Sequence, residues 1–409
     1  MTKHTHVIVG ASLAGANAAA ALRKRGFDGR IVLIGNEPHA PYERPELSKK
    51  YLRGEIEAPV LVQNAGYYPE NQIELVTGTQ VRSIDAGARR VETGAGSFGY
   101  DRLLIATGAS PRPLDVPGAE LDGVHTLRTK EDADAIRRAA QEGRSVVVVG
   151  SGWIGSEVAA SLRQLGADVT IVSLTEMPLQ HVVGREVGAI YRAVHEEHGV
   201  RFVTDTKVGR VLGRGRAAGV ETVDGRRVGG DLVVAGVGAE PRTTIATAAG
   251  LTVRNGIVVD SSLETSAPGV FAAGDAANAW NPHYDRHLRV EHWDNAKRQG
   301  RAAAASMLGE KTPYDRVPYF YSDQYDLGME YTGHALVWDE VVFRGDPESR
   351  EFIAFWLVGG RVVAGMNVNV WDVGPAIQAL VRSRASVDRR LLVDPEVPLD
   401  TIGALEAAA

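Results

Sequence analysis

The 409-residue sequence predicts an α/β fold in which two Rossmann-like domains are followed by a C-terminal α+β domain with an antiparallel sheet. The duplication is indicated by a strand, a glycine-rich turn and a helix-forming run that occur near the N-terminus and again after residue 145. The third domain is indicated by a change to alternating apolar and polar residues from about Tyr319 onward.

The first unit begins with the β-rich run Val7–Val9 and turns at Gly10–Gly15. A helix-forming run continues to about Gly26, and a second apolar strand follows at Ile31–Ile34. This order is that of a βαβ unit.

The second unit repeats these parts. The strand Val146–Val149 leads into a turn at Gly150–Gly155, a helix-forming run to about Gly166 and a strand at Val169–Val172. One βαβ unit can arise by chance, but two with the same spacing indicate an internal duplication.

A later strand and turn are duplicated as well. Tyr100–Arg112 aligns with Gly230–Arg242, and Asp, the second Gly, Ala, Pro and Arg fall in register. We therefore expect each βαβ unit to be closed by the same later strand and turn.

The remaining elements are predicted more coarsely. Helices are expected at Lys130–Gln141, Asn295–Leu308 and Val373–Arg384, together with a helix-like alanine run after Asp275. Strands are expected within Val200–Val228 around a turn at Asp224-Gly225, within 257–275, and in a meander of Val341–Arg344, Phe352–Leu357 and Val362–Val368 around Gly359-Gly360.

Composition excludes several function classes. The chain is 44% hydrophobic and 23% charged, with net charge -6 and a pI of about 6.0, so no global positive field attracts nucleic acid or a membrane surface. It contains no cysteine, which excludes disulfides, thiolate metal sites and thiol chemistry, and no metal site is predicted. No segment has transmembrane length. Because Gly10 and Gly15 fit a strand-to-helix turn better than a signal peptide, we expect a cytoplasmic protein.

The glycine turns predict two dinucleotide sites. A pyrophosphate needs backbone N–H donors at a helix N-terminus and no side chains in its way. Gly150, Gly152 and Gly155 give the full G-x-G-x-x-G pattern, whereas Ser12 replaces the middle glycine between Gly10 and Gly15. Tight packing of strand on helix explains many single matches, but the duplication favours phosphate binding.

Acidic residues that follow the second strands would bind ribose hydroxyls. Glu37 fits this position in the first unit, and Ser173 stands where the acid is expected in the second. Further along, Asp275 ends an apolar run and could bind the ribityl hydroxyls of a flavin, or simply cap a helix.

At this point the chain resembles the FAD-dependent ferredoxin reductases of bacterial oxygenase systems, the putidaredoxin-reductase type within the glutathione-reductase-like structural class. Tyr42–Lys49 resembles the family's R-P-P-L-S-K segment with Glu46 for the second proline, and Thr107-Gly108 resembles its A-T-G turn. Arg289–Ala296 resembles the segment beside the flavin pyrimidine, and Tyr319–Tyr325 resembles W-F-W-S-D-Q-Y, with Tyr319 and Tyr321 for tryptophans.

The resemblance implies domains and sites. The expected domains are an FAD-binding domain at 1–112 and 243–318, an NAD(P)H-binding domain at 113–242 and a C-terminal interface domain at 319–409. The FAD-binding residues are expected to be Gly10, Ser12, Ala14, Gly15, Glu37, Arg44, Lys49, Val81, Ala106, Thr107, Gly108, Asp275, Glu291, His292 and Trp293. The NAD(P)-binding residues are expected to be Gly150, Gly152, Trp153, Ile154, Gly155, Glu157, Ser173 and Gly238.

Lys49 and Glu157 are the expected catalytic residues. In the family this lysine lies beside the flavin ring and pairs with a glutamate of the second glycine-rich helix. An ammonium there would stabilise negative charge on the reduced flavin, and a carboxylate would position it. Trp153 could cover the flavin or pack in the core.

The predicted function is transfer of a hydride from NAD(P)H to FAD and then of single electrons to a two-iron two-sulfur ferredoxin that serves a monooxygenase or dioxygenase. Without cysteine, electrons cannot leave through a redox thiol. The alternatives are an NAD(P)H oxidase, a quinone or dye reductase, and an NADH-responsive redox sensor. Lys297, Arg298 and Arg301 are the expected ferredoxin-docking residues, although charge runs are often only solvated helix faces.

The second glycine unit also predicts the choice of nicotinamide. Ser173 offers no carboxylate to repel a 2′-phosphate, and no arginine lies within Leu174–Val183 to hold one. We expect NADH to be preferred with weak discrimination, measured as the ratio of kcat/KM for NADH and NADPH. A preference for NADPH above roughly a hundredfold, about 2.7 kcal/mol, would reveal a phosphate-binding residue elsewhere.

Overall fold

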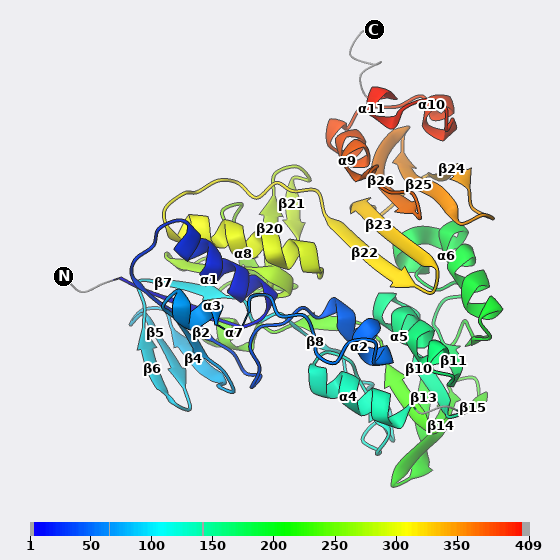
Figure 1. The fold of residues 1–409 in the computed structure, drawn as a ribbon, viewed down its shortest axis with the longest axis horizontal. Helices are drawn as coiled ribbons and strands as arrows, with labels where there is room; N and C mark the ends of the chain where they lie inside the picture. The colour runs from blue at the N-terminus through cyan, green and yellow to red at the C-terminus, as the bar shows by residue number, and fades with distance from the viewer. Residues whose placement is uncertain (1–3, 65, 141–142, 403–409) are drawn as a thin grey trace. The chain divides into compact units, whose positions relative to one another are not determined.

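A computed structural model describes residues 4–64, 66–140 and 143–402. The chain divides into two compact units, each built from discontinuous segments (Figure 1). Unit 1 comprises Met1–Arg44, Pro59–Ser110 and Ala239–Arg316, and unit 2 comprises Pro45–Ala58, Pro111–Gly238 and Val317–Ala409.

Unit 1 is built on a parallel sheet with the strand order β19-β7-β1-β2-β3. Its strands are β1 (Thr5–Val9), β2 (Arg30–Ile34), β3 (Ile73–Val76), β7 (Arg102–Ile105) and β19 (Val270–Ala272). Their residues are almost all apolar because helices or other strands cover both faces of a parallel sheet.

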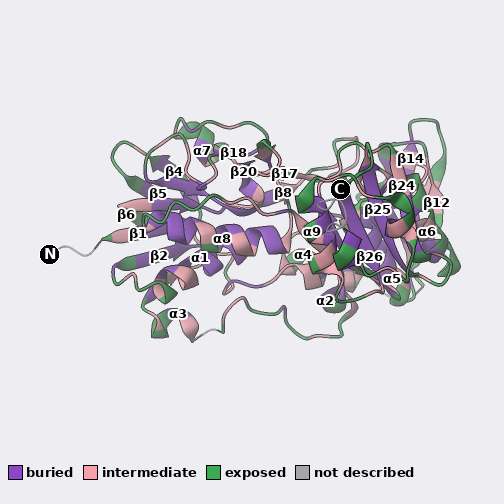
Figure 2. Cartoon of the chain, turned by 90° about the horizontal axis from the view of Figure 1, so that it is seen from above, coloured by how far each residue is buried: buried purple, intermediate pink, exposed green. Residues whose placement is uncertain are grey.

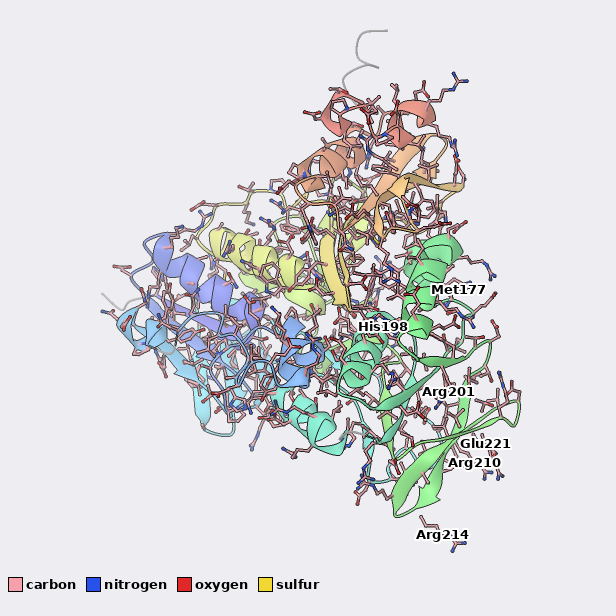
Figure 3. All side chains as sticks on the ribbon, turned by 45° about the vertical axis from the view of Figure 1, so that its right-hand side comes forward. Met177, His198, Arg201, Arg210, Arg214 and Glu221 are labelled. Atoms are coloured by element: carbon pink, nitrogen blue, oxygen red, sulfur yellow. The ribbon has the colours of Figure 1, made fainter. Side chains whose placement is uncertain are left out.

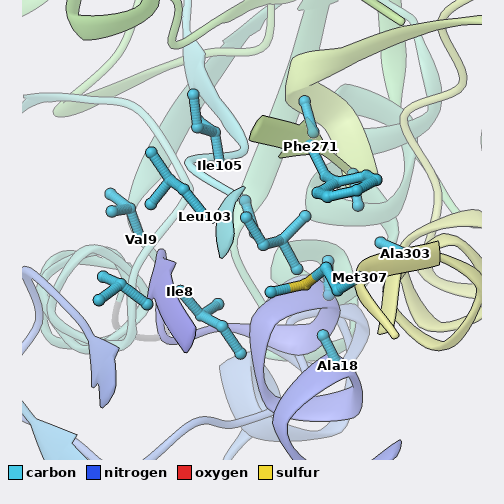
Figure 4. Close-up of a cluster of buried hydrophobic side chains, with 14 of the residues drawn as sticks. Ile8, Val9, Ala18, Leu103, Ile105, Phe271, Ala303 and Met307 are labelled. Carbon is cyan, nitrogen blue, oxygen red and sulfur yellow. The ribbon is translucent and has the colours of Figure 1, made fainter. Parts of the chain in front are cut away.

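Two helices of unit 1 pack closely against each other. They are α1 (Leu13–Lys24) and α8 (Trp293–Met307), which lie side by side in Figure 1. An added Cβ at Gly300 would lie 2.2 Å from the carbonyl oxygen of Ala14, so the close approach requires glycine. Figure 4 shows Ala18, Ala303 and Met307 of these helices in one core with Ile8 and Phe271 of the sheet.

Smaller elements complete unit 1. One small antiparallel sheet is formed by β4 (Val81–Asp85), β5 (Arg90–Thr93) and β6 (Gly96–Gly99). A second small sheet is formed by β18 (Ile257–Val259), β20 (Ala277–Asn281) and β21 (Arg286–Leu288). The short helices are α3 (Tyr67–Glu70), α7 (Thr244–Ala248) and the 3-10 turn η2 (Gly274–Ala276).

The alanine-rich run after Asp275 was predicted to be helix-like, and this prediction is wrong. Residues Ala277–Asn281 form strand β20, which pairs in parallel with β18 and antiparallel with β21. Asn278 also donates a hydrogen bond to the backbone oxygen of Arg254. Pairing along both edges outweighs the helix propensity of alanine.

Unit 2 contains a second parallel sheet with the order β12-β11-β10-β16-β9. Its strands are β9 (Val124–His125), β10 (Ser145–Val149), β11 (Asp168–Val172), β12 (Arg201–Val203) and β16 (Leu232–Ala235). Strands β16, β10, β11 and β12 follow the same order as β7, β1, β2 and β3 in unit 1. The matching later strands, β7 and β16, each close a βαβ unit, as the duplication predicts.

The helix after Lys130, the helix after Gly152 and the strands within Val200–Val228 were predicted, whereas the helix Gln180–Glu197 was not. These and further helices and strands complete this part. They are η1 (Pro45–Ser48), α2 (Lys50–Arg53), α4 (Lys130–Ala139), α5 (Trp153–Gln164), α6 (Gln180–Glu197), β13 (Val208–Arg214), β14 (Arg216–Thr222) and β15 (Arg227–Gly229). Gln141, the last residue of the predicted helix from Lys130, lies outside the described residues. The crossover strands β8 (Ala109–Pro111) and β17 (Ala239–Pro241) pair with each other.

Opposite charges pair across the hairpin of β13 and β14. Arg210 and Glu221 form an ion pair of 2.8 Å and lie together in Figure 3, where Arg214 extends from the hairpin end. Exposed pairs of this kind contribute little stability because water and salt screen them.

The C-terminal part of unit 2 contains the predicted antiparallel sheet, in the order β22-β23-β26-β25-β24. Its elements are β22 (Tyr319–Gln324), β23 (Leu327–Gly333), β24 (Glu340–Asp346), β25 (Glu351–Val358), β26 (Arg361–Val368), α9 (Gly374–Ser383), α10 (Arg389–Val393) and α11 (Leu399–Ile402). Strands β25 and β26 are mostly buried (Figure 2).

A buried arginine connects this sheet to the last helices. The Arg344 guanidinium donates to the backbone oxygens of Leu392, Pro395 and Val397. Burial lowers the pKa of Arg344 from its ordinary value, although Asp394 opposes this effect.

We predict that Arg344→Met lowers the free energy of unfolding by about 2–3 kcal/mol, because three backbone carbonyls lose their charged donor. Hydrogen exchange should speed up first in Arg389–Ile402. Arg361→Met, which alters an exposed arginine of the same sheet, should change stability little. Equal effects of the two substitutions would show that the Arg344 hydrogen bonds are unimportant.

Candidate functional site

The first glycine turn follows β1 at the carboxyl edge of the unit 1 sheet. Gly10 has φ +117°, and an added Cβ there would lie 2.0 Å from the Ala106 carbonyl oxygen. An added Cβ at Gly15 would lie 2.0 Å from the Gly10 carbonyl oxygen. Both positions therefore require glycine for packing, whatever the turn binds.

The second turn has the same geometry. Gly150 has φ +100°, an added Cβ there would lie 2.4 Å from the Gly236 carbonyl oxygen, and one at Gly155 would lie 2.2 Å from that of Gly150. By contrast, an added Cβ at Gly152 would meet no atom within 4 Å among the described residues. Packing explains the first and third glycines, whereas the middle one leaves space beside the helix end.

The helix N-termini at these turns suit anions. The N-caps of α1 and α5 are Ser12 and Gly152; neither makes a side-chain cap, and neither first turn contains an acidic residue. The first N–H groups of a helix have no partner within the helix, and its dipole favours negative charge there. Both turns thus fit the pyrophosphate of a dinucleotide.

Several other predicted residues of unit 1 lie at the same sheet edge. Glu37 follows β2, Ala106, Thr107 and Gly108 follow β7, and Asp275 follows β19. Ligands of doubly wound sheets bind at the carboxyl ends of the strands. The Thr107 hydroxyl donates to the Arg242 backbone oxygen at 2.7 Å, which fixes this turn.

Glu37 has partners within unit 1. Its carboxylate accepts hydrogen bonds from the Tyr42 hydroxyl and the Arg44 guanidinium, and the latter contact is an ion pair. The structure therefore brings Glu37 and Arg44 into one half-buried cluster, in which the carboxylate orients the guanidinium.

The other predicted FAD-binding residues of unit 1 occupy mixed environments. Val81 and Ala14 are buried. Glu291 pairs with Arg289, and the His292 ring accepts the Asp294 N–H as the N-cap of α8. This cap makes α8 begin at Trp293, two residues before the predicted start.

The corresponding residues of unit 2 follow the carboxyl ends of its parallel strands. Ser173 follows β11 and is buried, with its hydroxyl 2.6 Å from that of Ser151, and Gly238 follows β16. Ile154 and Leu174 are exposed, at 47% and 67%. Ser173 therefore lies deep in the turn and presents no charge to a ribose.

Lys49 and Glu157 are both within unit 2 and form a buried ion pair. The Lys49 Nζ lies 3.0 Å from the Glu157 Oε2, and the side chains are 6% and 5% exposed. Lys49 also donates to the Pro45 backbone oxygen and lies 5.6 Å from the centre of the Tyr321 ring. A charged pair so deeply buried is costly to desolvate, so good geometry and further hydrogen bonds are needed to hold it.

Two serines, to which the sequence analysis gave no role, also donate hydrogen bonds to the Glu157 carboxylate. Ser48 donates to Glu157 Oε2 at 2.5 Å, and Ser322 donates to Oε1 at 2.6 Å. Both belong to the segments identified by resemblance. Ser322 and Gln324 lie on the same face of β22 and are both buried; strand alternation predicts the shared face, and the structure shows that this face is buried.

Trp153 packs against other aromatic rings of unit 2. Its ring centre lies 4.9 Å from that of Phe320 and 6.1 Å from that of Tyr191, both edge-on. The half-buried indole thus makes core contacts at the start of α5.

The predicted docking cations on α8 have local contacts. Lys297 Nζ lies 4.2 Å from the centre of the Trp293 ring, Arg298 pairs with Asp294, and Arg301 Nε donates to Asn17 Oδ1 at 3.1 Å. Lys297 and Arg298 are half-buried, whereas Arg301 is exposed.

The duplicated parallel sheets, each with a phosphate-type turn, define the class of two-dinucleotide flavoprotein oxidoreductases. The chain belongs to the pyridine nucleotide-disulphide oxidoreductase family, whose model matches residues 4–300, and the reductase C-terminal model matches residues 319–403. The chain is an oxidoreductase, and FAD and NAD(P)H are its cofactors.

Two relatives and one solved structure are similar to the chain over nearly its whole length. The chain is 39% identical over 400 residues to the probable ferredoxin reductase CtmF of Castellaniella defragrans, covering 97% of this chain and 98% of the relative. It is 38% identical over 392 residues to the ferredoxin–NAD(+) reductase component of the biphenyl dioxygenase system of Paraburkholderia xenovorans, covering 95% and 96%. The solved covalent complex of putidaredoxin reductase with putidaredoxin matches with a TM-score of 0.94 and 37% identity over 100% of both chains.

The family's name refers to the reduction of disulphides. Disulphide reduction needs a thiol, and this chain contains no cysteine. Within the described residues, no cluster of histidines and carboxylates could hold a metal ion, and no helix is both long and apolar enough to cross a bilayer.

The two glycines at the second turn give a matched test. Gly152→Ala should leave the free energy of unfolding within about 0.5 kcal/mol of the wild type, because the added methyl group meets no protein atom and the backbone there has φ -75°. The same methyl group should raise the dissociation constant for NADH about tenfold, about 1.4 kcal/mol, by occupying phosphate space.

Gly155→Ala should instead destabilise the fold, because its methyl group would meet a backbone carbonyl. Chemical denaturation and NADH titration of both variants would check this. Unchanged NADH affinity in Gly152→Ala would place the pyrophosphate elsewhere.

Proposed function

We propose that the chain is an NAD(P)H:ferredoxin reductase that supplies electrons to a two-iron two-sulfur ferredoxin of a monooxygenase or dioxygenase system. The observation that carries this proposal is the combination of two phosphate turns on separate parallel sheets with a C-terminal antiparallel domain in a cysteine-free chain. The names of the relatives and the partner in the matched complex point to a ferredoxin as acceptor.

FAD, when bound, would accept two electrons as hydride from the nicotinamide and release them one at a time to an iron–sulfur acceptor. The turn Gly10–Gly15 and Arg44 would hold its phosphates, Glu37 would bind its adenosine ribose, and Asp275 would bind its ribityl chain. The turn Gly150–Gly155 would hold the nicotinamide dinucleotide. Such a redox role fits a cytoplasmic location, where reduced nicotinamide is available.

Lys49 would serve as the fixed cation near the flavin ring. Its ammonium is buried and held by Glu157. The ammonium therefore need not change position when negative charge develops on the flavin. Glu157 would contribute by holding that ammonium in place. This assignment rests on the family resemblance together with the burial and geometry of the pair.

Acceptor selectivity tests the function. With NADH as donor, the purified flavoprotein should reduce a two-iron two-sulfur ferredoxin at least about tenfold faster than it consumes oxygen. Turnover dominated by oxygen or small quinones would indicate an oxidase or dye reductase. NADH-dependent dimerisation without turnover would indicate a redox sensor.

The α8 cations give a prediction about docking. Lys297→Glu combined with Arg301→Glu should raise the KM for ferredoxin about tenfold and flatten its dependence on salt, because fewer charges remain to steer an acidic partner. Ferricyanide reduction should change much less, since a small oxidant needs no docked orientation.

Lys24→Glu, a charge reversal at an exposed lysine at the end of α1, serves as the control and should leave the KM for ferredoxin near its original value. If the double variant lost activity with ferredoxin and with ferricyanide to the same extent, these residues would support the fold, as the Arg301–Asn17 contact allows.

A further inference from the structure

A buried chain of hydrogen bonds leads from Glu157 across β22 to α6. Ser322 donates to Glu157 Oε1 at 2.6 Å, and the Gln324 amide nitrogen donates to the Ser322 Oγ at 3.3 Å. The Gln324 Oε1 lies 2.9 Å from the Nε2 of His195. All four residues belong to unit 2 and are buried.

The direction of these hydrogen bonds is fixed by chemistry. An ionised carboxylate only accepts, so the Ser322 hydroxyl must donate to Glu157 and can only accept from Gln324. The Gln324 oxygen then accepts from His195, which must carry its proton on Nε2. Burial lowers the pKa of His195 to about 4, so the ring is neutral near pH 7 and has a single N–H to give.

The two oxygens of Glu157 therefore have separate tasks. Oε2 accepts from Lys49 and Ser48, whereas Ser322 is the hydrogen-bond donor found for Oε1 among the described residues. Loss of the Ser322 hydroxyl would leave Oε1 buried without a donor and free the carboxylate to turn away from Lys49. An unsatisfied buried oxygen is expensive, and a hydrogen bond to a charged group is stronger than one between neutral groups.

We propose that Ser322 is a positioning residue whose hydroxyl, oriented by Gln324 and His195, holds the Glu157 carboxylate against Lys49. This rests on the proposed role of Lys49 at the flavin for its effect on the reaction, but not for its effect on the lysine itself. The side chain of Ser322 is assigned no contact with the nicotinamide or the flavin.

The test compares Ser322→Ala with Ser322→Thr, which keeps the hydroxyl, and with Ser306→Ala, which removes a buried hydroxyl from α8 in unit 1. In each holoprotein, acetylation of Lys49 by acetic anhydride is measured by peptide mass spectrometry against the exposed Lys24. Ser322→Ala should raise the labelling rate of Lys49 several-fold because the pair is loosened. Ser322→Thr and Ser306→Ala should label like the wild type.

Stopped-flow reduction by saturating NADH supplies the second readout. Ser322→Ala should lower the rate of flavin reduction about tenfold, the size expected for one hydrogen bond to a charged group, with NADH affinity and FAD content unchanged. Ser322→Thr should restore most of the rate. Wild-type labelling and a wild-type rate in Ser322→Ala would overturn the positioning role.

The two proposals fail in different ways. If NADH does not reduce the wild-type flavin, the proposed function fails, and Lys49 labelling still decides whether Ser322 positions the pair. If NADH reduces the flavin but Ser322→Ala labels like the wild type, only the positioning role is wrong. Should Ser322→Ala not fold, Gln324→Leu, which removes the donor to Ser322, must raise Lys49 labelling; an unchanged rate would contradict the proposal.

Discussion

The buried carboxylate of Glu157 is the constraint on which the candidate site depends. A carboxylate removed from water must be paired and hydrogen-bonded, and Glu157 obtains its three donors from two distant parts of the sequence. Lys49 and Ser48 come from the 45–58 segment and Ser322 from the C-terminal sheet. The Ser161 hydroxyl also donates to the Ser48 backbone oxygen at 2.6 Å. These bonds hold the 45–58 segment within unit 2, although the residues on either side belong to unit 1.

The glycine turns show how one sequence pattern serves two purposes. The first and third glycines of each turn are required because a backbone carbonyl lies against them, so they would be needed in a protein that bound nothing. The middle position is different: Gly152 has open space, and Ser12 occupies the equivalent position in the first unit. Information about ligand binding is therefore concentrated at the middle position and at the helix N-terminus, not in the glycine count.

The sequence predicted the fold well where periodicity is strong. The strands Val146–Val149 and Val169–Val172 and the matching later strands are continuous apolar runs, and the structure pairs them in the duplicated order. The prediction for the alanines after Asp275 was wrong because alanine favours a helix locally, while the partner strand β18 is supplied by tertiary structure. The helix α6 is kinked at Gly184, where φ is +82°, a conformation that favours glycine.

Less of the candidate site than of the fold could be predicted from the sequence alone. The Lys49–Glu157 pair was expected only from resemblance, because no local pattern connects residues 108 positions apart, and the structure forms the contact within unit 2. Strand alternation puts Ser322 and Gln324 on one face of β22, but their burial and their place in a hydrogen-bond chain depend on how β22 packs against α5 and α6. The roles of the FAD- and NAD(P)-binding residues stay predictions for the same reason.

We propose that the Lys49–Glu157 pair acts as one unit for the flavin and is not kept for stability. A double-mutant cycle of Lys49→Met, Glu157→Gln and the combined variant tests it most directly, with flavin reduction by NADH and denaturant unfolding measured on the same samples. The account predicts that the double variant reduces flavin no more slowly than Lys49→Met alone, while its stability exceeds that of Lys49→Met, in which a buried carboxylate has lost its cation. Rate losses that simply add, or a double variant less stable than both single variants, would contradict the account.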